Sequence, residues 1–394
     1  MAVFEVYSKF EAGTGVKLNL TKCQGLWLGA WRNRLDSPVA ITWNSDKIKT
    51  LGVFVGYGDL KEANWHPMID AVECCLNSWR SRSLSFSSKA LVINPLALSR
   101  IWYVASLVFM PPWVCRELNK IIFNFFCSGK RDLVARNAVI QPPDLGGFSV
   151  VPIQFKVYSL LTQWVKRLLV NPNGWTFLLK YWLLDRFDAT PFEVLASTID
   201  YAIERLPSFY SALFTAWSCL RGTSVSSVLM IGAGAPSGPI SAALTSCKAS
   251  HQLLLSLHVM PPHCVSKFAP SFGMLDWPAT WRSLQFMPLD RQVRDFSWKV
   301  AHSVLYTADH LISFGYQYLL SCFCGYHLEC PKHLFFSCPS ARTGLDWIQS
   351  QLFLASPLAP SLSVRHVLFA FSSDDLLCVP RVFAYMLSVC KILV

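Results

Sequence analysis

The sequence lacks a long uninterrupted run of apolar residues. Its longest charge-free segment lies between Arg221 and Lys248, but glycine, serine and proline dominate it. Residues 101–115 are apolar, yet they are too few to cross a bilayer and contain two adjacent prolines. The first ten residues also lack the apolar core and the cleavage site of a secretory signal. We therefore expect no membrane span and a reducing compartment, either nucleus or cytoplasm.

Signatures of several enzyme classes are missing as well. The sequence has no Gly-x-Ser-x-Gly nucleophile motif, and its glycine clusters at residues 52–58 and 232–234 lack the Lys and Ser/Thr of a P-loop. Its 14 cysteines are scattered and do not have the pattern of a secreted disulfide framework. The thiols are therefore expected to be free for metal binding.

Acidic residues are scarce relative to basic ones. The chain has 24 Asp and Glu against 35 Lys and Arg, a net charge of +11 and a pI near 9.0. This balance favours a polyanionic partner such as nucleic acid. Hydrophobic residues make up 53% of the 394, with 15 Trp and 27 Phe, which excludes a disordered chain. So apolar a composition also suggests surface that another segment or a partner covers.

The hydrophobic patterns predict a fold that is mainly α with a small β portion (α+β). Alternating residues favour short strands at 16–20, 25–30 and 48–55. Apolar residues spaced by three and four favour helices at 65–79, 89–109 (interrupted near Pro95), 117–126, 157–169, 291–314 and 344–353. The Ser/Gly/Ala-rich residues 222–246 are the best candidate for a domain linker.

A cluster of Cys and His near the C-terminus carries the clearest chemistry. Cys322, Cys324, His333 and Cys338 form a Cys-x-Cys…His-x4-Cys array, which can supply the three thiolates and one imidazole of a tetrahedral zinc site. Cys330 is a spare thiol that could replace one ligand, and buried cysteines around a core histidine remain the alternative. The other nearby histidines that could compete as ligands are His302, His310 and His327. Loss of a ligand should unfold so short a loop locally.

Several segments resemble, in order, the reverse transcriptases of LINE-type (non-LTR) retrotransposons. Phe10-Glu-Ala-Gly-Thr-Gly-Val-Lys-Leu-Asn-Leu-Thr-Lys22 resembles the segment that follows the catalytic carboxylates, and residues 48–56 resemble the primer grip. Leu76-Asn-Ser-Trp-Arg-Ser-Arg-Ser-Leu-Ser85 is similar to a thumb helix, and Asp144-Leu-Gly-Gly-Phe-Ser-Val150 to a Gly-Gly turn beyond it. Asp295-Phe-Ser-Trp-Lys-Val-Ala-His302 and His333-Leu-Phe-Phe-Ser-Cys-Pro339 are similar to the zinc-binding C-terminal domain of that family.

The resemblance implies an order of regions along the chain. These are a residual end of the palm with its strands (1–58), a thumb-like helical region (59–136), a helical connector (137–221), a linker-like segment (222–275), a small zinc-knuckle domain (276–345) and a C-terminal helical tail (346–394). In the family, a Tyr/Phe-x-Asp-Asp turn holds the catalytic metal upstream of the segment with which this sequence opens. We therefore expect no catalytic residue and no polymerisation by this chain alone.

Two other acidic sites are interpreted as loops or helix caps rather than metal sites. Ser372-Ser-Asp-Asp-Leu376 lies beyond the zinc array, and Tyr57-Gly-Asp-Leu60 offers a single carboxylate.

Binding chemistry is expected in the thumb-like region. Residues 61–136 contain ten Lys and Arg but five Asp and Glu. The predicted contacts to RNA or DNA phosphates, without sequence preference, come from Arg80, Arg82, Lys89, Arg100, Lys130 and Arg131. Trp27, Trp31 and Trp43 could stack on bases, although packing against strands is the simpler interpretation.

The expected function is a non-catalytic remnant of a LINE-type reverse transcriptase that retains nucleic-acid binding through a basic thumb and a zinc knuckle. Two alternatives remain. The first alternative is a decayed transposon reading frame without selected function. The second is a protein-interaction module whose aromatic surface binds a partner in trans, such as a catalytic palm fragment.

Overall fold

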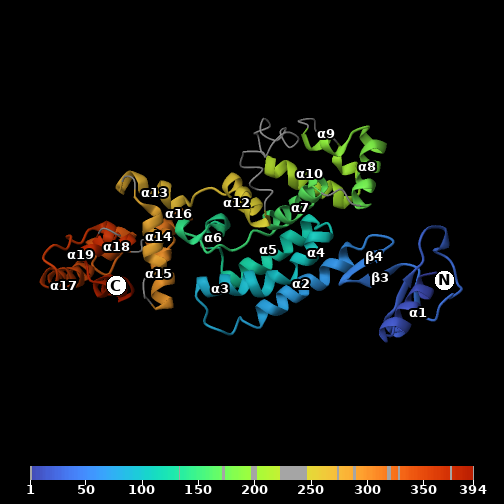
Figure 1. Ribbon diagram of the computed structural model, residues 1–394. Helices are drawn as coiled ribbons and strands as arrows, with labels where there is room; N and C mark the ends of the chain where they lie inside the picture. Colours follow the sequence, from blue (N-terminus) through green and yellow to red (C-terminus); the bar gives the residue numbers. More distant parts are fainter. Residues whose placement is uncertain are drawn as a thin grey trace.

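The computed structural model describes residues 2–132, 134–170, 174–196, 202–221, 246–272, 275–286, 290–316, 321–326, 329–372 and 375–393. Its elements are mainly helices with four short strands among the described residues, which confirms the predicted fold class. The molecule is elongated, and its two termini lie at opposite ends (Figure 1). No described helix is long and apolar enough to cross a membrane.

The N-terminal part holds the strands. After helix α1 (Ala2–Thr14) come two small sheets, a parallel pair of β1 (Gln24–Leu26) with β2 (Thr42–Asn44) and an antiparallel pair of β3 (Lys47–Thr50) with β4 (Val53–Gly56). The strand predicted at 48–55 is therefore a hairpin. Its turn residues Leu51 and Gly52 both have positive φ, as a tight two-residue hairpin turn requires.

The strand predicted at 16–20 is absent. The side chain of Asn19 accepts a hydrogen bond from the Thr21 N–H and caps a single 3₁₀ turn at Leu20–Lys22. This local bond competes with an extended backbone, which the alternation of apolar residues cannot reveal.

A helical body follows the strands. Its helices are α2 (Lys61–Asn77), α3 (Phe86–Val92), α4 (Trp102–Leu107), α5 (Pro112–Phe126) and α6 (Arg136–Ile140). The predicted interruption near Pro95 is confirmed, because a π-type turn at Ile93–Ala97 separates α3 from α4. Helix α5 begins earlier than predicted because Pro112 fits its first turn, where a missing N–H costs nothing.

The next helices surround a second, smaller core. They are α7 (Ile153–Val170), α8 (Gly174–Phe187), α9 (Pro191–Ala196), α10 (Ser208–Arg221) and α12 (Cys247–His258). Helix α7 contains the predicted helix at 157–169. Most of the candidate linker, residues 222–245, lies outside the described residues, whereas α12 and α13 (His263–Phe272) occupy the later part of the region expected to be linker-like.

The C-terminal region consists of α14 (Trp277–Phe286), α15 (Arg291–Ala301), α16 (Ala308–Ser313), α17 (Pro339–Ala355), α18 (Val364–Phe369), α19 (Asp375–Cys378) and α20 (Arg381–Leu393). The helix predicted at 291–314 is two helices, because the chain turns at Ser303 with a φ of +56°. Helix α17 contains the predicted helix at 344–353 and runs through the boundary expected between 345 and 346.

The helical body and the C-terminal region share one buried core. It includes Val72 of α2, Leu118 of α5, Trp298 of α15 and Leu387 of α20. The turn at Gly146 joins the two parts, since its carbonyl oxygen accepts hydrogen bonds from the Trp298 indole at 2.8 Å and the His302 ring at 2.9 Å.

Candidate metal centre

Four side chains from separate local structures meet near the C-terminal end of the molecule. The sulfurs of Cys322, Cys324 and Cys338 and a ring nitrogen of His333 all lie within 4.8 Å of one another. Cys322, His333 and Cys338 are buried, whereas Cys324 is exposed. The Cys3His group predicted from the spacing is therefore gathered in one place.

A tight turn presents the first two cysteines. The N–H of Gly325 donates to the Cys322 carbonyl at 2.9 Å, and the N–H of Cys322 donates to the Tyr326 carbonyl at 3.0 Å. Gly325 has a φ of +84°, a conformation that residues with a Cβ rarely adopt. The two cysteines are thus held in a closed loop of five residues.

A π-type turn at His333–Ser337 relates the other two ligands. The N–H of Cys338 reaches back five residues to the His333 carbonyl at 2.7 Å. Such widened turns are rare and often occur at functional sites. Here the turn separates His333 from Cys338 by one wide loop of backbone, and Cys338 then serves as the residue that precedes α17.

Two distances within the group lie close to those expected around a tetrahedral zinc ion. With Zn–S near 2.3 Å and Zn–N near 2.0–2.1 Å, tetrahedral geometry requires about 3.8 Å between two sulfurs and about 3.5 Å between sulfur and nitrogen. The Cys322 and Cys338 sulfurs are 3.7 Å apart, and the Cys324 sulfur is 3.2 Å from His333 Nε2. A small expansion of the second pair would accommodate the ion.

The position of Cys338 favours its metal-binding form. Burial alone would raise the pKa of this thiol, but the backbone N–H groups of Ser340 and Ala341 and the neighbouring thiols outweigh it. The resulting pKa of Cys338 lies below the ordinary value. Such lowering is typical of thiols at helix N-termini, and the thiolate is the form that binds a metal.

The alternative ligands have other partners or lie elsewhere. Cys330 is outside the four-residue group, and its sulfur accepts a hydrogen bond from the His333 N–H at 3.4 Å. His302 is buried between Gly146 and Cys264, and the ring of His310 packs near Phe314. His327 lies outside the described residues.

Aromatic packing ties the cluster to the protein core. The Tyr326 ring stacks on the His333 imidazole with centroids 4.2 Å apart and an angle of 10°. Phe335, within the π-type turn, is buried and meets Phe296 of α15 edge to face at 6.0 Å. Tyr326 therefore orients the His333 ring, and Phe335 anchors the turn that carries it.

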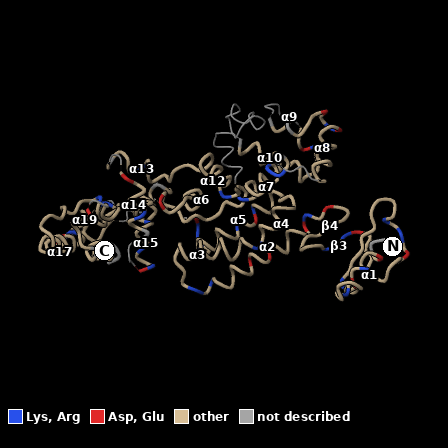
Figure 2. Tube along the Cα trace, in the orientation of Figure 1, with Lys and Arg blue, Asp and Glu red and all other residues tan. Residues whose placement is uncertain are grey.

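Five of the six basic residues predicted to bind phosphates are exposed. Arg80 and Arg82 are exposed on the loop between α2 and α3, which carries Lys or Arg colouring in Figure 2, and Lys130 and Arg131 are exposed just after α5. Arg100 is exposed near the start of α4, where its side chain donates to the Leu96 carbonyl at 3.2 Å.

Lys89 differs from this set because it points inward. Its side chain is buried, and its ammonium donates to the Phe126 carbonyl at 2.8 Å and to the Ser128 hydroxyl at 2.5 Å. Its first role is therefore to hold the C-terminal end of α5 against α3.

The tryptophans and the isolated acids also have assigned contacts. Trp27 is buried and stacks on Trp43 at 4.1 Å, whereas Trp31 is 62% exposed. Asp59 accepts the N–H of Lys61 at the start of α2, and Asp375 accepts the N–H of Ser372. Each carboxylate therefore accepts a backbone N–H beside the start of a helix, α2 or α19, whereas Asp374 lies outside the described residues.

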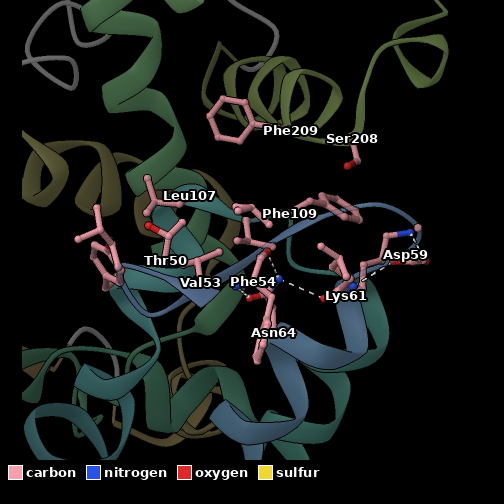
Figure 3. A pocket seen from close by; sticks show the side chains of 16 residues that line it. Thr50, Val53, Phe54, Asp59, Lys61, Asn64, Leu107, Phe109, Ser208 and Phe209 are labelled. Carbon is pink, nitrogen blue, oxygen red and sulfur yellow. Dashed lines mark hydrogen bonds and ion pairs between the residues drawn. The ribbon is translucent and has the colours of Figure 1, made fainter. Parts of the chain in front are cut away.

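A cavity that no sequence pattern indicated lies beside the hairpin. It has a volume of about 450 Å³, and it is lined by β3 and β4, α4 and the start of α10 (Figure 3). At its floor, the Asn64 amide accepts from the Phe54 N–H at 2.8 Å and donates to the Phe54 carbonyl at 3.1 Å. The Asn64 side chain thus makes the two hydrogen bonds to the Phe54 backbone that a neighbouring strand would otherwise make. Only the tertiary structure shows this pairing.

Comparison with known proteins gives one informative similarity. No protein-family model matches the chain. Over 225 residues it is 26% identical to the "Transposon TX1 uncharacterized 149 kDa protein" of Xenopus laevis, in an alignment that covers 54% of this chain and 17% of that protein. The chain thus spans about a sixth of the length of this relative. The similarity supports a transposon-related origin for a chain whose C-terminal region gathers a group of three cysteines and one histidine.

Proposed function

We propose that the chain is the thumb and zinc-binding part of a LINE-type reverse transcriptase, and that it binds nucleic acid. The observation that carries this proposal is the Cys3His group, whose distances fit zinc. The similarity to a transposon protein supports the origin, and the order of the family-like segments supports the identity of the parts.

In this function the zinc ion has a structural role. Four protein ligands would close its coordination sphere, as in structural rather than catalytic sites. The ion would hold the loop at 322–326 and the start of α17 in one arrangement. The exposed rings of Phe323 and Tyr326 would then be presented to solvent on a fixed loop.

The basic thumb-like region would supply the affinity. Arg80, Arg82, Lys130 and Arg131 are exposed on the two connections that follow α2 and α5. Contacts from such side chains neutralise phosphates and release counterions, so binding should depend on charge and salt rather than on sequence. Nuclear or cytoplasmic location and a lack of membrane attachment belong to the same proposal.

The test uses the full chain and three variants. Zinc content is measured for the wild type, Cys322→Ser, His333→Ala and Cys330→Ser, and binding to a labelled RNA–DNA duplex is followed by fluorescence anisotropy. We expect one zinc per wild-type chain, retained in Cys330→Ser and lost in the other two. Duplex affinity should fall several-fold in the two zinc-free variants.

Four results would count against the proposal. Zinc that persists in Cys322→Ser would reject the ligand set, and equal loss in Cys330→Ser would give that thiol a ligand role. A zinc-loaded chain that binds no duplex at low salt would favour a decayed reading frame. Tight binding to a catalytic fragment without nucleic-acid affinity would favour the protein-interaction module.

A further inference from the structure

A second cavity lies within the helical body, far along the chain from the Cys3His group. It has a volume of about 320 Å³ and lies between the loop that follows α2 and the C-terminal end of α5. The polar side chains that matter for its chemistry are Arg80, Arg82, Lys89, Asn124 and Ser128. Among the described residues, no carboxylate lines it. Three cations therefore share one small cavity without an acidic neighbour in its wall.

Lys89 gives this cavity a buried charge. The lysine is only 9% exposed, and two of its three ammonium protons are donated to Phe126 and Ser128. Burial is the main cause that lowers the Lys89 pKa, and Asp295 opposes it from outside the cavity wall. Asp295 in turn accepts the N–H of Phe86 at 3.0 Å. An anion in the cavity would accept a hydrogen bond from the third ammonium proton and offset the cost of burying this charge.

Arg82 is held in place before any ligand arrives. Its guanidinium lies over the Trp79 ring, with the central carbon 4.2 Å from the ring centroid. The N–H of Arg82 also donates to the Trp79 carbonyl at 3.2 Å, which coils the loop beneath the side chain. A guanidinium fixed by stacking presents a planar fork of donors that matches two phosphate oxygens.

We propose that this cavity binds one phosphate group of a nucleic acid strand, between the Arg80 and Arg82 guanidinium groups and the Lys89 ammonium. The source of the phosphate rests on the proposed function; the chemistry of the cavity does not. A phosphodiester within a strand and a phosphate at a 5′ end offer the same oxygens, and the experiment separates them.

The experiment compares two double variants of the full chain with equal loss of charge. Arg80→Gln/Arg82→Gln removes both exposed cations of the cavity, and Arg116→Gln/Lys120→Gln removes two exposed cations of the same helical body outside it. Lys89 is left intact because it holds α5. A urea unfolding curve for each variant establishes that both are folded.

Binding of the labelled duplex is measured over a series of salt concentrations. We expect the cavity variant to weaken duplex binding about tenfold or more and to reduce the salt slope by about one, because a single phosphate contact is lost. The control variant should lose less than about a third as much affinity. Equal losses in the two variants would overturn the proposal, since a general basic field would then explain both.

Two further probes identify the source and separate the two proposals. Oligonucleotides with and without a 5′ phosphate should bind the wild type equally if the cavity takes an internal phosphodiester, whereas a preference that is lost in the cavity variant assigns it to strand ends. Inorganic phosphate is titrated by calorimetry. Phosphate binding that disappears in the cavity variant, in a chain that binds no nucleic acid, would keep the cavity and reject the proposed function. If neither probe binds, the cavity proposal fails as well.

Discussion

At the scale of single residues, a partly buried carboxylate on helix α15 and a buried histidine at its end have pKa values shifted in opposite directions. Burial raises the pKa of Asp295 to about 6, although the Phe86 N–H, Lys299 and Lys89 act against it. Burial lowers the pKa of His302 to about 4, against the bond to the Gly146 carbonyl. The folded protein therefore favours the neutral form of each side chain.

The first prediction concerns Asp295. Because its pKa is about 6 in the folded state and near 3.9 when unfolded, the folded chain keeps a proton that the unfolded chain releases between these values. The free energy of unfolding should therefore fall as pH rises from about 4 to about 6, by roughly 2 kcal/mol from this group. Asp295→Asn should remove that fall while still accepting the Phe86 N–H.

Urea unfolding at pH 4.5 and pH 7 checks this expectation. His302 titrates in the same range with the opposite sign, so the informative quantity is the difference between wild type and variant at each pH. Asp70→Asn, at an exposed position on α2, serves as the control. If Asp295→Asn and the wild type change in parallel between the two pH values, the carboxylate titrates normally.

Residue types and spacing indicated the metal cluster but not the burial of individual charges. The grouping of residues 322, 324, 333 and 338 could be predicted because they lie close together in the sequence, so a short loop is enough to bring their side chains together. The role of Lys89 depends on Phe126 and Ser128, which lie 37 and 39 positions away. Spacing also left Cys330 open, and its backbone hydrogen bond is visible only in three dimensions.

At the scale of elements, the turn at Gly146 and Gly147 joins the helical body to the C-terminal region. A Cβ at Gly146 would lie 2.6 Å from the Trp281 ring, and one at Gly147 would lie 2.0 Å from the Gln141 carbonyl oxygen. The first contact is with a buried side chain and the second is with backbone. Neither neighbour can move without disturbing the contact between the helical body and the C-terminal region.

The second prediction is that Gly147→Ala destabilises the chain strongly. Overpacking against buried atoms costs about 1–3 kcal/mol, and contact with backbone should place this substitution at or above the upper end. Gly174→Ala is the matched control, since nothing lies within 4 Å of its added Cβ at the start of α8. Urea unfolding should separate the two variants by more than about 2 kcal/mol; similar midpoints would show that the turn can relax.

Sequence patterns located α2 to α5, α7 and α15 to α17 but missed the other described helices, and they misjudged where elements break. The hairpin at β3 and β4 looked like one strand because apolar alternation continues through Leu51 and Gly52. The helix expected at 291–314 looked continuous because its stripe passes Ser303. In both places a positive φ reverses the chain, and in the second a serine adopts it without the glycine that would announce a turn. The partners of the Gly-Gly turn were equally hidden, since Trp281 and Trp298 follow more than 130 positions later.

At the scale of the whole molecule, the region expected to be a C-terminal tail is part of the main core. Ile348 and Leu352 of α17 are buried together with Phe383 and Leu387 of α20. The same core continues through α15 into α3 and α5. The metal cluster adjoins this core through Phe335, while Cys322, Cys338 and Ala341 form a small separate cluster.

This arrangement predicts a graded response to metal removal. Without the ion, the loop at 322–326 and the π-type turn lose the ligands that organise them, because the separate cluster contains too few apolar residues to hold them. Hydrogen exchange should therefore accelerate at residues 322–338 and in the first turn of α17 after chelation. Helices α2 and α5 should keep their protection, since their buried contacts do not involve the cluster.

Cys330→Ser should respond to the chelator as the wild type does, whereas Cys322→Ser should resemble the chelated protein before any chelator is added. Acceleration that reaches α5 would mean that the ion stabilises the whole shared core rather than its edge. Exchange that chelation leaves unchanged at 322–338 would mean that packing alone orders the loop, and the Cys3His group would then lose its structural role. The gradient of protection from the cluster toward α5 thus distinguishes a metal that builds a local surface from one on which the entire fold depends.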